Sequence, residues 1–336
     1  MSQDLSVLEP FLGGLAGFNR VVLQPGATPD QFSAAERTVG FRFPPDLRRF
    51  YQACNGLTVS VIRPLDSDEY EPKPRRSMKL NYVPAFRILP LKEAAALYHN
   101  PAGEVGFPDL QRTYGLFPFT DAYDSDTYYY GCKSALRGRI IHVRHDDYSY
   151  PASRSLKSFL RLVWRTLGMQ SDLRFLREGH DFSDWIPLRT PEDDLAAREL
   201  LRLAAGESLT KEVRHLCRQW AAAMLSPESL EEFAEILDRG NETGRTIAYG
   251  RLCHIASPGA DRLLRAYHRK KQRFLESLQN AFERAGFDAR PKEGSLHVKG
   301  VGHMNVEQLF TERHDPKILR DVLARNADKR ANDSFA

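Results

Sequence analysis

The chain has 336 residues, of which 42% are hydrophobic and 27% are charged, and its formal net charge is +4. This balance is typical of a globular protein with about two domains, and no apolar run approaches the ~20 residues that a membrane-spanning helix needs. The small basic excess is spread along the chain, whereas nucleic-acid binding usually requires a concentrated basic stripe. Composition therefore argues against a nucleic-acid partner.

The amino-terminal segment MSQDLSVLEPFLGG has no basic region before its short apolar stretch, so it does not have the form of a secretory signal. The four cysteines are far apart in the sequence and form no C-x-x-C pair, which indicates free thiols in a reducing compartment. They are Cys54, Cys132, Cys217 and Cys253. We therefore predict a cytoplasmic protein that has no membrane association and no cofactor.

The first strong structural signal lies at residues 28–57, which have the pattern of two helices joined by a short connection. Thr28 is suited to cap a helix that has Pro29 at its first position and ends at Gly40. Pro44-Pro45 begins the second helix, and Asn55-Gly56 follows it. We expect Asn55 and Gly56 to supply left-handed residues that turn the chain into a sheet.

This pattern resembles the start of the SUKH superfamily, also called the Smi1/Knr4 domain. The residues that carry the resemblance are Glu36, Val39-Gly40, Phe43–Tyr51 and Asn55–Leu57. Three later stretches resemble later elements of the same family, and they are Ile88–Ala94, Leu116–Phe119 and Ser155–Leu160. The resemblance covers roughly residues 1–167. It implies a protein-binding module, often a bacterial immunity protein that neutralises a toxin, and it implies no active site.

Further along, strand patterns alternate with loops. We predict helices at residues 92–99 and Ser153–Leu167, an exposed loop at 63–80, and a second loop at Asn100–Pro108. The predicted strands are Thr58–Ile62, Leu116–Thr120, Tyr128–Cys132 and Gly138–Arg144. Residues 1–170 are thus predicted to form an α+β domain, with helices packed on a mostly antiparallel sheet.

The second half of the chain has a different texture. Residues 171–191 contain prolines and aromatics and are predicted to be an ordered connector, followed by a mainly helical domain at 192–325. The predicted helices are Glu192–Ala205, Thr210–Leu225, Glu228–Asp238, Glu242–Ile255 and a helix from Pro258 to about Ala285. A hairpin is expected near residues 287–298, and residues 326–336 are expected to be a frayed tail.

The best candidate for partner binding is an acidic and aromatic stretch at residues 121–130. Three carboxylates precede a strand of tyrosines, and a similar group follows the next strand. These candidate residues are Asp121, Asp124, Asp126, Tyr128, Tyr129, Asp146, Asp147 and Tyr148. Because side chains alternate along a strand, at least one tyrosine ring should be exposed. Tyrosines are common interface anchors, and carboxylates would attract a basic partner.

Two alternatives remain open for this stretch. It could be an ordinary strand entry with hydrated turn acids. It could also be a Ca²⁺ loop formed by Asp121, Asp124 and Asp126, although the spacing and the missing glycine do not match an EF-hand.

Other groups of polar residues have simpler interpretations. His142 and His145 lie beside two aspartates, but their spacing favours a structural or solvent-exposed role. The carboxyl-terminal histidines are His297, His303 and His314, and no cysteine or carboxylate completes a zinc set. The basic run between Arg262 and Arg273 has the pattern of a hydrated helix face, with an acidic partner or nucleic acid as the alternative. Because no catalytic motif is present, we predict that the protein is not an enzyme and holds no metal.

The leading functional hypothesis is therefore a non-catalytic immunity protein that binds a cognate bacterial toxin and occludes its active site or substrate groove. The alternative is a Smi1/Knr4-type regulatory scaffold that binds several protein partners. A third hypothesis makes the carboxyl-terminal region catalytic or nucleic-acid-binding. One observation opposes the first: immunity partners of basic nucleases are often acidic overall, and this chain is not.

Overall fold

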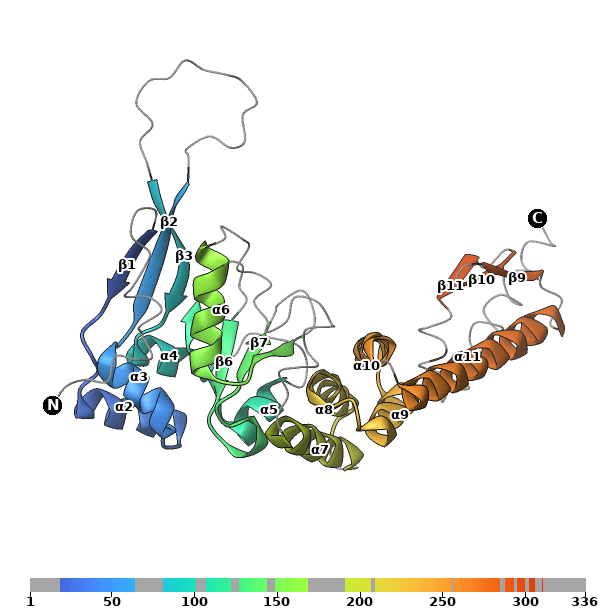
Figure 1. The fold of residues 1–336 in the computed structure, drawn as a ribbon, viewed down its shortest axis with the longest axis horizontal. Helices are drawn as coiled ribbons and strands as arrows, with labels where there is room; N and C mark the ends of the chain where they lie inside the picture. Colours follow the sequence, from blue (N-terminus) through green and yellow to red (C-terminus); the bar gives the residue numbers. More distant parts are fainter. Residues whose placement is uncertain are drawn as a thin grey trace, which may run out of the picture. The chain divides into compact units, whose positions relative to one another are not determined.

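The protein is described by a computed structural model that covers residues 19–63, 81–100, 107–121, 127–143, 149–168, 191–206, 209–255, 257–284, 288–292, 295–299, 302–305 and 310. The chain divides into two compact units, Met1–Ser226 and Pro227–Ala336 (Figure 1). The first is α+β with antiparallel sheets, and the second is mostly helical with a small sheet. The predicted fold class is confirmed.

The first unit contains two four-stranded antiparallel sheets. One has the order β1 (Asn19–Leu23), β2 (Leu57–Arg63), β3 (Asn81–Ile88) and β5 (Thr120–Asp121). The other has the order β4 (Leu116–Pro118), β6 (Thr127–Gly131), β7 (Ile140–Val143) and β8 (Tyr150–Ser153). A short 3-10 helix, η2 (Ser134–Leu136), lies between β6 and β7.

The helices of the first unit cover these sheets (Figure 1). Their bounds are α2 (Pro29–Val39), α3 (Pro45–Ala53), α4 (Leu91–Leu97), α5 (Phe107–Tyr114), α6 (Leu156–Gly168), α7 (Pro191–Ala205) and α8 (Lys211–Met224). Phe159 of α6 connects the two sheets, because its ring lies 6.0 Å from Phe86 of β3 and 4.8 Å from Tyr128 of β6. One hydrophobic core therefore runs under both sheets.

Several predicted elements of the first unit are confirmed, and others were missed. The helices at 28–57, 92–99 and 153–167 are present, as are the strands around β2, β4, β6 and β7. The sequence interpretation gave no range for β1, β3, α5 or β8, and the strand predicted at Leu116–Thr120 is divided between β4 and β5, which belong to different sheets. Phe107-Pro108 was assigned to a loop, whereas it begins α5, where the first turn of a helix tolerates proline.

Helices α7 and α8 belong to the first unit. The indole Nε1 of Trp220 in α8 donates a hydrogen bond to the backbone oxygen of Ser149 beside β8, with an N···O distance of 3.1 Å. The Trp220 ring lies 6.4 Å from Phe107, whose own ring lies 4.9 Å from Tyr129 of β6. The predicted connector at 171–191 stays a prediction, because residues 169–190 lie outside the described part.

The second unit begins with α9 (Leu230–Arg239) and α10 (Glu242–His254), followed by the long helix α11 (Pro258–Arg284). A three-stranded antiparallel sheet follows, in the order β11 (Gly302–Asn305), β10 (Ser295–Val298) and β9 (Ala289–Lys292). The carboxyl-terminal half of α11 packs on this sheet through a small core that includes Leu278, Phe282 and Leu296. The predicted hairpin is confirmed, and β11 is an additional strand.

Candidate partner-binding site

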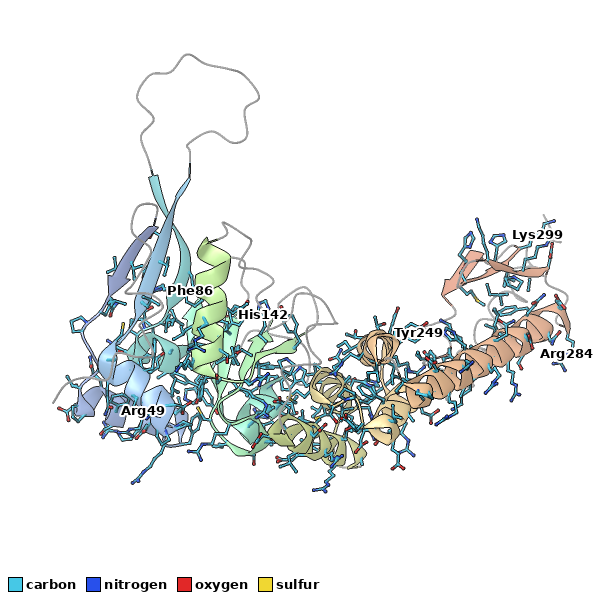
Figure 2. All side chains as sticks on the ribbon, in the orientation of Figure 1. Arg49, Phe86, His142, Tyr249, Arg284 and Lys299 are labelled. Atoms are coloured by element: carbon cyan, nitrogen blue, oxygen red, sulfur yellow. The ribbon has the colours of Figure 1, made fainter. Side chains whose placement is uncertain are left out.

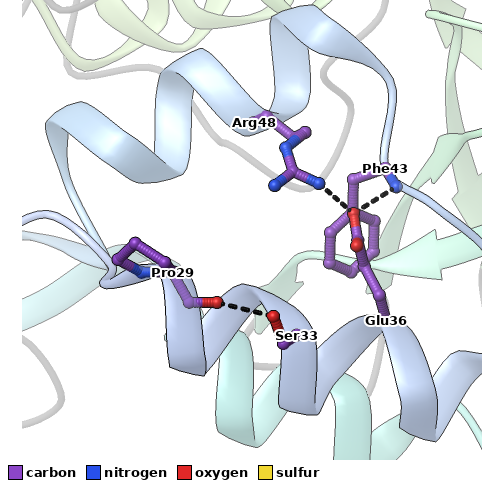
Figure 3. A network of polar contacts seen from close by, with 5 residues as sticks. All are labelled: Pro29, Ser33, Glu36, Phe43 and Arg48. Atoms are coloured by element: carbon purple, nitrogen blue, oxygen red, sulfur yellow. Dashed lines mark hydrogen bonds and ion pairs between the residues drawn. The ribbon is translucent and has the colours of Figure 1, made fainter.

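The helical pair α2–α3 is held by a carboxylate between the two helices. Thr28 caps α2 by accepting a hydrogen bond from the Gln31 backbone, and Gly40 ends the helix with a φ of 79°, as the sequence predicts. Glu36 Oε1 accepts a hydrogen bond from the backbone N–H of Phe43 at 2.9 Å and forms an ion pair with Arg48 (Figure 3). The Arg48 guanidinium also lies 4.8 Å from the centre of the Phe32 ring.

Asn55 has a different role from the one predicted. Gly56 has a φ of 125° and makes the turn, but Asn55 is not in the left-handed region. Instead, its side-chain oxygen accepts a hydrogen bond from the backbone N–H of Leu91 at 2.9 Å. This contact satisfies an open donor at the start of α4, where Pro90 offers no side-chain cap. Asn55 therefore joins α3 to α4.

Asp46 connects the α2–α3 pair to the β4-β6-β7-β8 sheet. Tyr130 of β6 donates its hydroxyl hydrogen to Asp46 in the first turn of α3. Burial, followed by the hydrogen bond to Asp46, raises the pKa of Tyr130. Tyr51, which is also buried, donates to the backbone oxygen of Leu89 at 3.0 Å, and burial raises its pKa as well. These residues hold the α3 helix on β6 and on the chain just after β3.

The expected exposed tyrosine is absent from β6, and this prediction is wrong. Tyr128 and Tyr129 are each 2% exposed, and Tyr130 is fully buried. Tyr128 faces the core beneath α6, where its ring stacks on His142 with centres 4.2 Å apart. Tyr129 faces the other side of the sheet and packs on Phe107 of α5. Both faces of this sheet are covered, so alternation places no ring in solvent.

Of the acidic candidates, the described part of the chain contains Asp121. Asp121 is the last residue of β5, opposite Arg87 of β3. Asp124, Asp126, Asp146, Asp147 and Tyr148 lie outside the described residues. The strands that flank these segments are neighbours, because Thr127 at the start of β6 pairs with Val143 at the end of β7. Residues 122–126 and 144–148 therefore connect to the sheet at the same end.

His142 is a buried structural residue, which is the role that the sequence favours. Its Nδ1 lies 2.9 Å from the Tyr150 hydroxyl on β8, and its ring stacks on Tyr128. His145 lies outside the described residues. In the second unit, His297 and His303 are opposite each other on β10 and β11, with ring centres 4.4 Å apart. His314 lies outside the described residues.

The described part of the chain offers no evident metal centre, and its buried thiols are held in the protonated form. It contains no group of three or more His, Cys, Asp or Glu side chains that could hold a metal ion. All four cysteines are free, and all but Cys253 are buried. Burial raises the pKa of Cys132 and raises that of Cys217 to about 12, which keeps these thiols protonated at neutral pH.

The comparisons with known proteins agree with the fold. Residues 26–162 match the model of the SMI1/KNR4 family (SUKH-1). The matched segment begins before α2 and ends within α6, so α7, α8 and the whole second unit lie outside it. No curated protein matches the chain. None of the described helices combines the length and apolar character that crossing a bilayer requires.

SUKH proteins are often toxin immunity proteins, and the family is typically non-catalytic. The residues that carry the resemblance in the sequence, from Glu36 to Leu57, build the α2–α3 pair and attach it to α4, to β6 and to the chain just after β3. The family pattern is therefore explained by packing and capping contacts. Residues 26–162 of this chain form an SMI1/KNR4 (SUKH-1) family domain.

Proposed function

We propose that this chain is a non-catalytic immunity protein, whose SUKH-1 domain binds a cognate bacterial toxin and occludes its active site or substrate groove. The observation that carries this proposal is the family match of residues 26–162. The contacts described above support it, because the motif residues of the domain are committed to packing and capping. The protein acts in the cytoplasm by binding, with no turnover of substrate.

The proposed contact surface comprises Asp121, Asp124, Asp126, Asp146, Asp147 and Tyr148. Asp121 ends β5 of the β1-β2-β3-β5 sheet and precedes segment 122–126. The pairing of Thr127 with Val143 supports the grouping, since segments 122–126 and 144–148 both join the β4-β6-β7-β8 sheet there. Grouped carboxylates attract a basic partner surface and accelerate its association. Tyr128 and Tyr129 are removed from the proposed site because both rings are buried.

Neutralisation of a catalytic toxin requires slow release of the complex. A dissociation constant of about 1 nM corresponds to about 12 kcal/mol of binding free energy. Differences in affinity among related complexes arise mostly in the dissociation rate. We therefore expect a long-lived complex with one toxin molecule per chain.

The experiment is affinity purification of the tagged full chain from a lysate of its own source, followed by mass spectrometry. The variant Asp124→Ala/Asp126→Ala/Asp146→Ala should lose the partner, because it removes charges from both segments, 122–126 and 144–148. A matched variant, Asp30→Ala, removes an exposed carboxylate from α2 of the same unit and should retain the partner. If the triple variant binds the partner as strongly as the unmodified chain does, the acidic surface is not the contact.

A second outcome of the same experiment distinguishes the immunity protein from the regulatory scaffold. Recovery of several unrelated proteins, with none in stoichiometric amount, would favour a Smi1/Knr4-type regulatory scaffold. The second unit, Pro227–Ala336, would then be the natural source of additional contacts, because it forms a compact body of its own.

A further inference from the structure

The long helix α11 carries a line of arginines along one exposed face. We define the arginine stripe as Arg262, Arg265, Arg269 and Arg273, all of which are exposed. At 3.6 residues per turn these positions fall within about 80° of the helix circumference and extend over roughly 16 Å of its axis. The opposite face of α11 is occupied, since Tyr267, Leu278 and Phe282 are buried.

The stripe lacks ionic partners within the part of the chain that the structure describes. The neighbouring Lys270 differs in this respect, because it forms an ion pair with Asp238 of α9. Glu276, the next residue on the stripe face, accepts a hydrogen bond from Gln272 at 3.0 Å. Like charges three or four residues apart destabilise a helix. Binding of an external anion would therefore relieve the repulsion among the stripe arginines.

Other exposed cations of this unit lie outside the stripe. Arg284 at the end of α11 and Lys299 after β10 are exposed and are labelled in Figure 2. Lys292 of β9 is exposed too, whereas Arg290 forms an ion pair with Asp288. These lysines lie on or directly after strands that pack, through Leu296, against Leu278 and Phe282 on the face of α11 opposite the stripe. The concentrated basic feature of this unit is α11 itself, which holds seven Lys or Arg and three Asp or Glu.

Within the described part of the second unit, the absence of large exposed apolar side chains around the stripe indicates which kind of partner the stripe binds. Protein interfaces are anchored by large apolar or aromatic side chains at their centre. Among the described residues, the large hydrophobic side chains that are exposed are Val22, Leu97 and Leu195, and all three belong to the first unit. A face with guanidinium groups and no apolar anchor suits a polyanion better than a folded protein. We propose that the arginine stripe of α11 binds the phosphodiester backbone of a nucleic acid, independently of toxin binding by the SUKH-1 domain.

Guanidinium groups are suited to this contact because each can donate two parallel hydrogen bonds to a phosphate. Contacts to phosphate carry no sequence information, so binding should depend on salt and hardly on base sequence. The whole-chain charge argued against nucleic acid, but that argument assumed that the basic residues were dispersed.

The test is fluorescence anisotropy of the full chain with a labelled single-stranded RNA and a labelled DNA duplex, each about 20 nucleotides or base pairs long, at several salt concentrations. We expect a micromolar dissociation constant at low salt for at least one probe, which is ordinary for backbone binding. Replacing all four arginines of the stripe by glutamine should weaken binding at least about 100-fold and lower the salt slope by about 3.

Two control variants separate the stripe from net charge and from misfolding. The first changes four exposed arginines of the first unit to glutamine, which removes the same charge from another surface; they are Arg37, Arg42, Arg49 and Arg161. It should keep the unmodified affinity within about threefold, because only phosphate contacts enter the salt-dependent term. The second replaces the stripe arginines by lysine, which should retain most of the binding.

Three outcomes would overturn the proposal. One is the absence of binding to either nucleic acid by the unmodified chain. Another is equal weakening by the two glutamine variants, which would mean that net charge alone attracts the probe. The third is binding to polyglutamate with none to nucleic acid, which would assign the stripe to an acidic protein. Circular dichroism melting of the stripe variant should show a helix at least as stable as the original, because like-charge repulsion is removed.

Discussion

Arg139, just before β7, forms a buried ion pair with Asp193 in the first turn of α7. Its N···O distance is 2.7 Å, and the two side chains are 9% and 10% exposed. Arg139 belongs to the SUKH-1 domain, whereas Asp193 lies beyond the segment that matches the family. The pair therefore fixes α7 to the family domain and, with Trp220, makes the α7–α8 pair part of the same folded unit.

We expect Asp193→Ala to destabilise the first unit by about 3–5 kcal/mol, because it leaves the Arg139 guanidinium buried without its carboxylate. The measurement is urea unfolding of the full chain followed by tryptophan fluorescence. The matched control is Glu93→Ala, which removes an exposed ion pair with Arg87 and should cost less than about 1 kcal/mol. Equal losses from the two variants would show that the Arg139–Asp193 pair does not fix α7.

The Trp220 contact gives a second measure of this attachment. Trp220→Ala removes a fully buried indole from the layer that covers Tyr129 and Phe107, and we expect a loss of about 3–5 kcal/mol. Trp220→Phe keeps most of the packing but removes the hydrogen bond to Ser149, so its cost should be nearer 1–2 kcal/mol. Unfolding midpoints in urea test this order, and a phenylalanine variant as unstable as the alanine variant would contradict it.

Two substitutions test whether the backbone contact or the ion pair of Glu36 stabilises the α2–α3 pair. Glu36→Ala removes both the ion pair to Arg48 and the acceptor for the Phe43 N–H, so we expect it to cost about 2–3 kcal/mol. Arg48→Ala leaves the Phe43 hydrogen bond in place and should cost only about 1 kcal/mol, partly through its lost contact with Phe32. If the arginine variant is the less stable of the two, the backbone contact of Glu36 is not what secures the pair.

The local parts of the fold could be predicted from the sequence because their causes are local. Thr28, Pro29 and Gly40 define α2 through contacts within a few residues, and the α11 helix follows from its apolar spacing. The role of Asn55 could not be predicted, since its partner Leu91 is 36 residues away. The burial of Tyr129 was missed for the same reason. Its ring packs on Phe107, and Phe107 in turn packs on Trp220 of the helix that begins at Lys211.

The acidic part of the candidate site stays a prediction, and the expected exposure of its tyrosines was wrong. Strand alternation predicts an exposed ring only when one face of the sheet is open to water. Here α6 covers the face of Tyr128, while α5 and α8 cover the face of Tyr129. The sequence did contain one indication that the second face of the sheet is covered. It is the helix that follows the family domain at residues 211–224.

The pH dependence of stability should include a contribution from His215 in α8. Burial, followed by the charges of Lys211 and Arg218, lowers the pKa of His215 from 6.5 to about 4. The unfolded chain therefore binds this proton at a higher pH than the folded chain does. The free energy of unfolding should decrease as the pH falls from about 6.5 to about 4.

Urea unfolding at several pH values would test this contribution. His215→Gln should flatten the loss of stability between about pH 6.5 and 4, compared with the unmodified chain. His99→Gln removes an exposed imidazole of the same unit and serves as the matched variant. If His215→Gln retains the full acid-induced loss, the loss comes from other titrating groups.

The central claim, neutralisation by binding, is tested most directly by titrating the recovered partner's toxic activity with the purified full chain. The account predicts that activity falls linearly and is abolished at one chain per partner molecule, with a dissociation constant of about 1 nM or tighter. A partner that stays fully active in the complex, or a lysate that provides no stoichiometric partner, would contradict the claim.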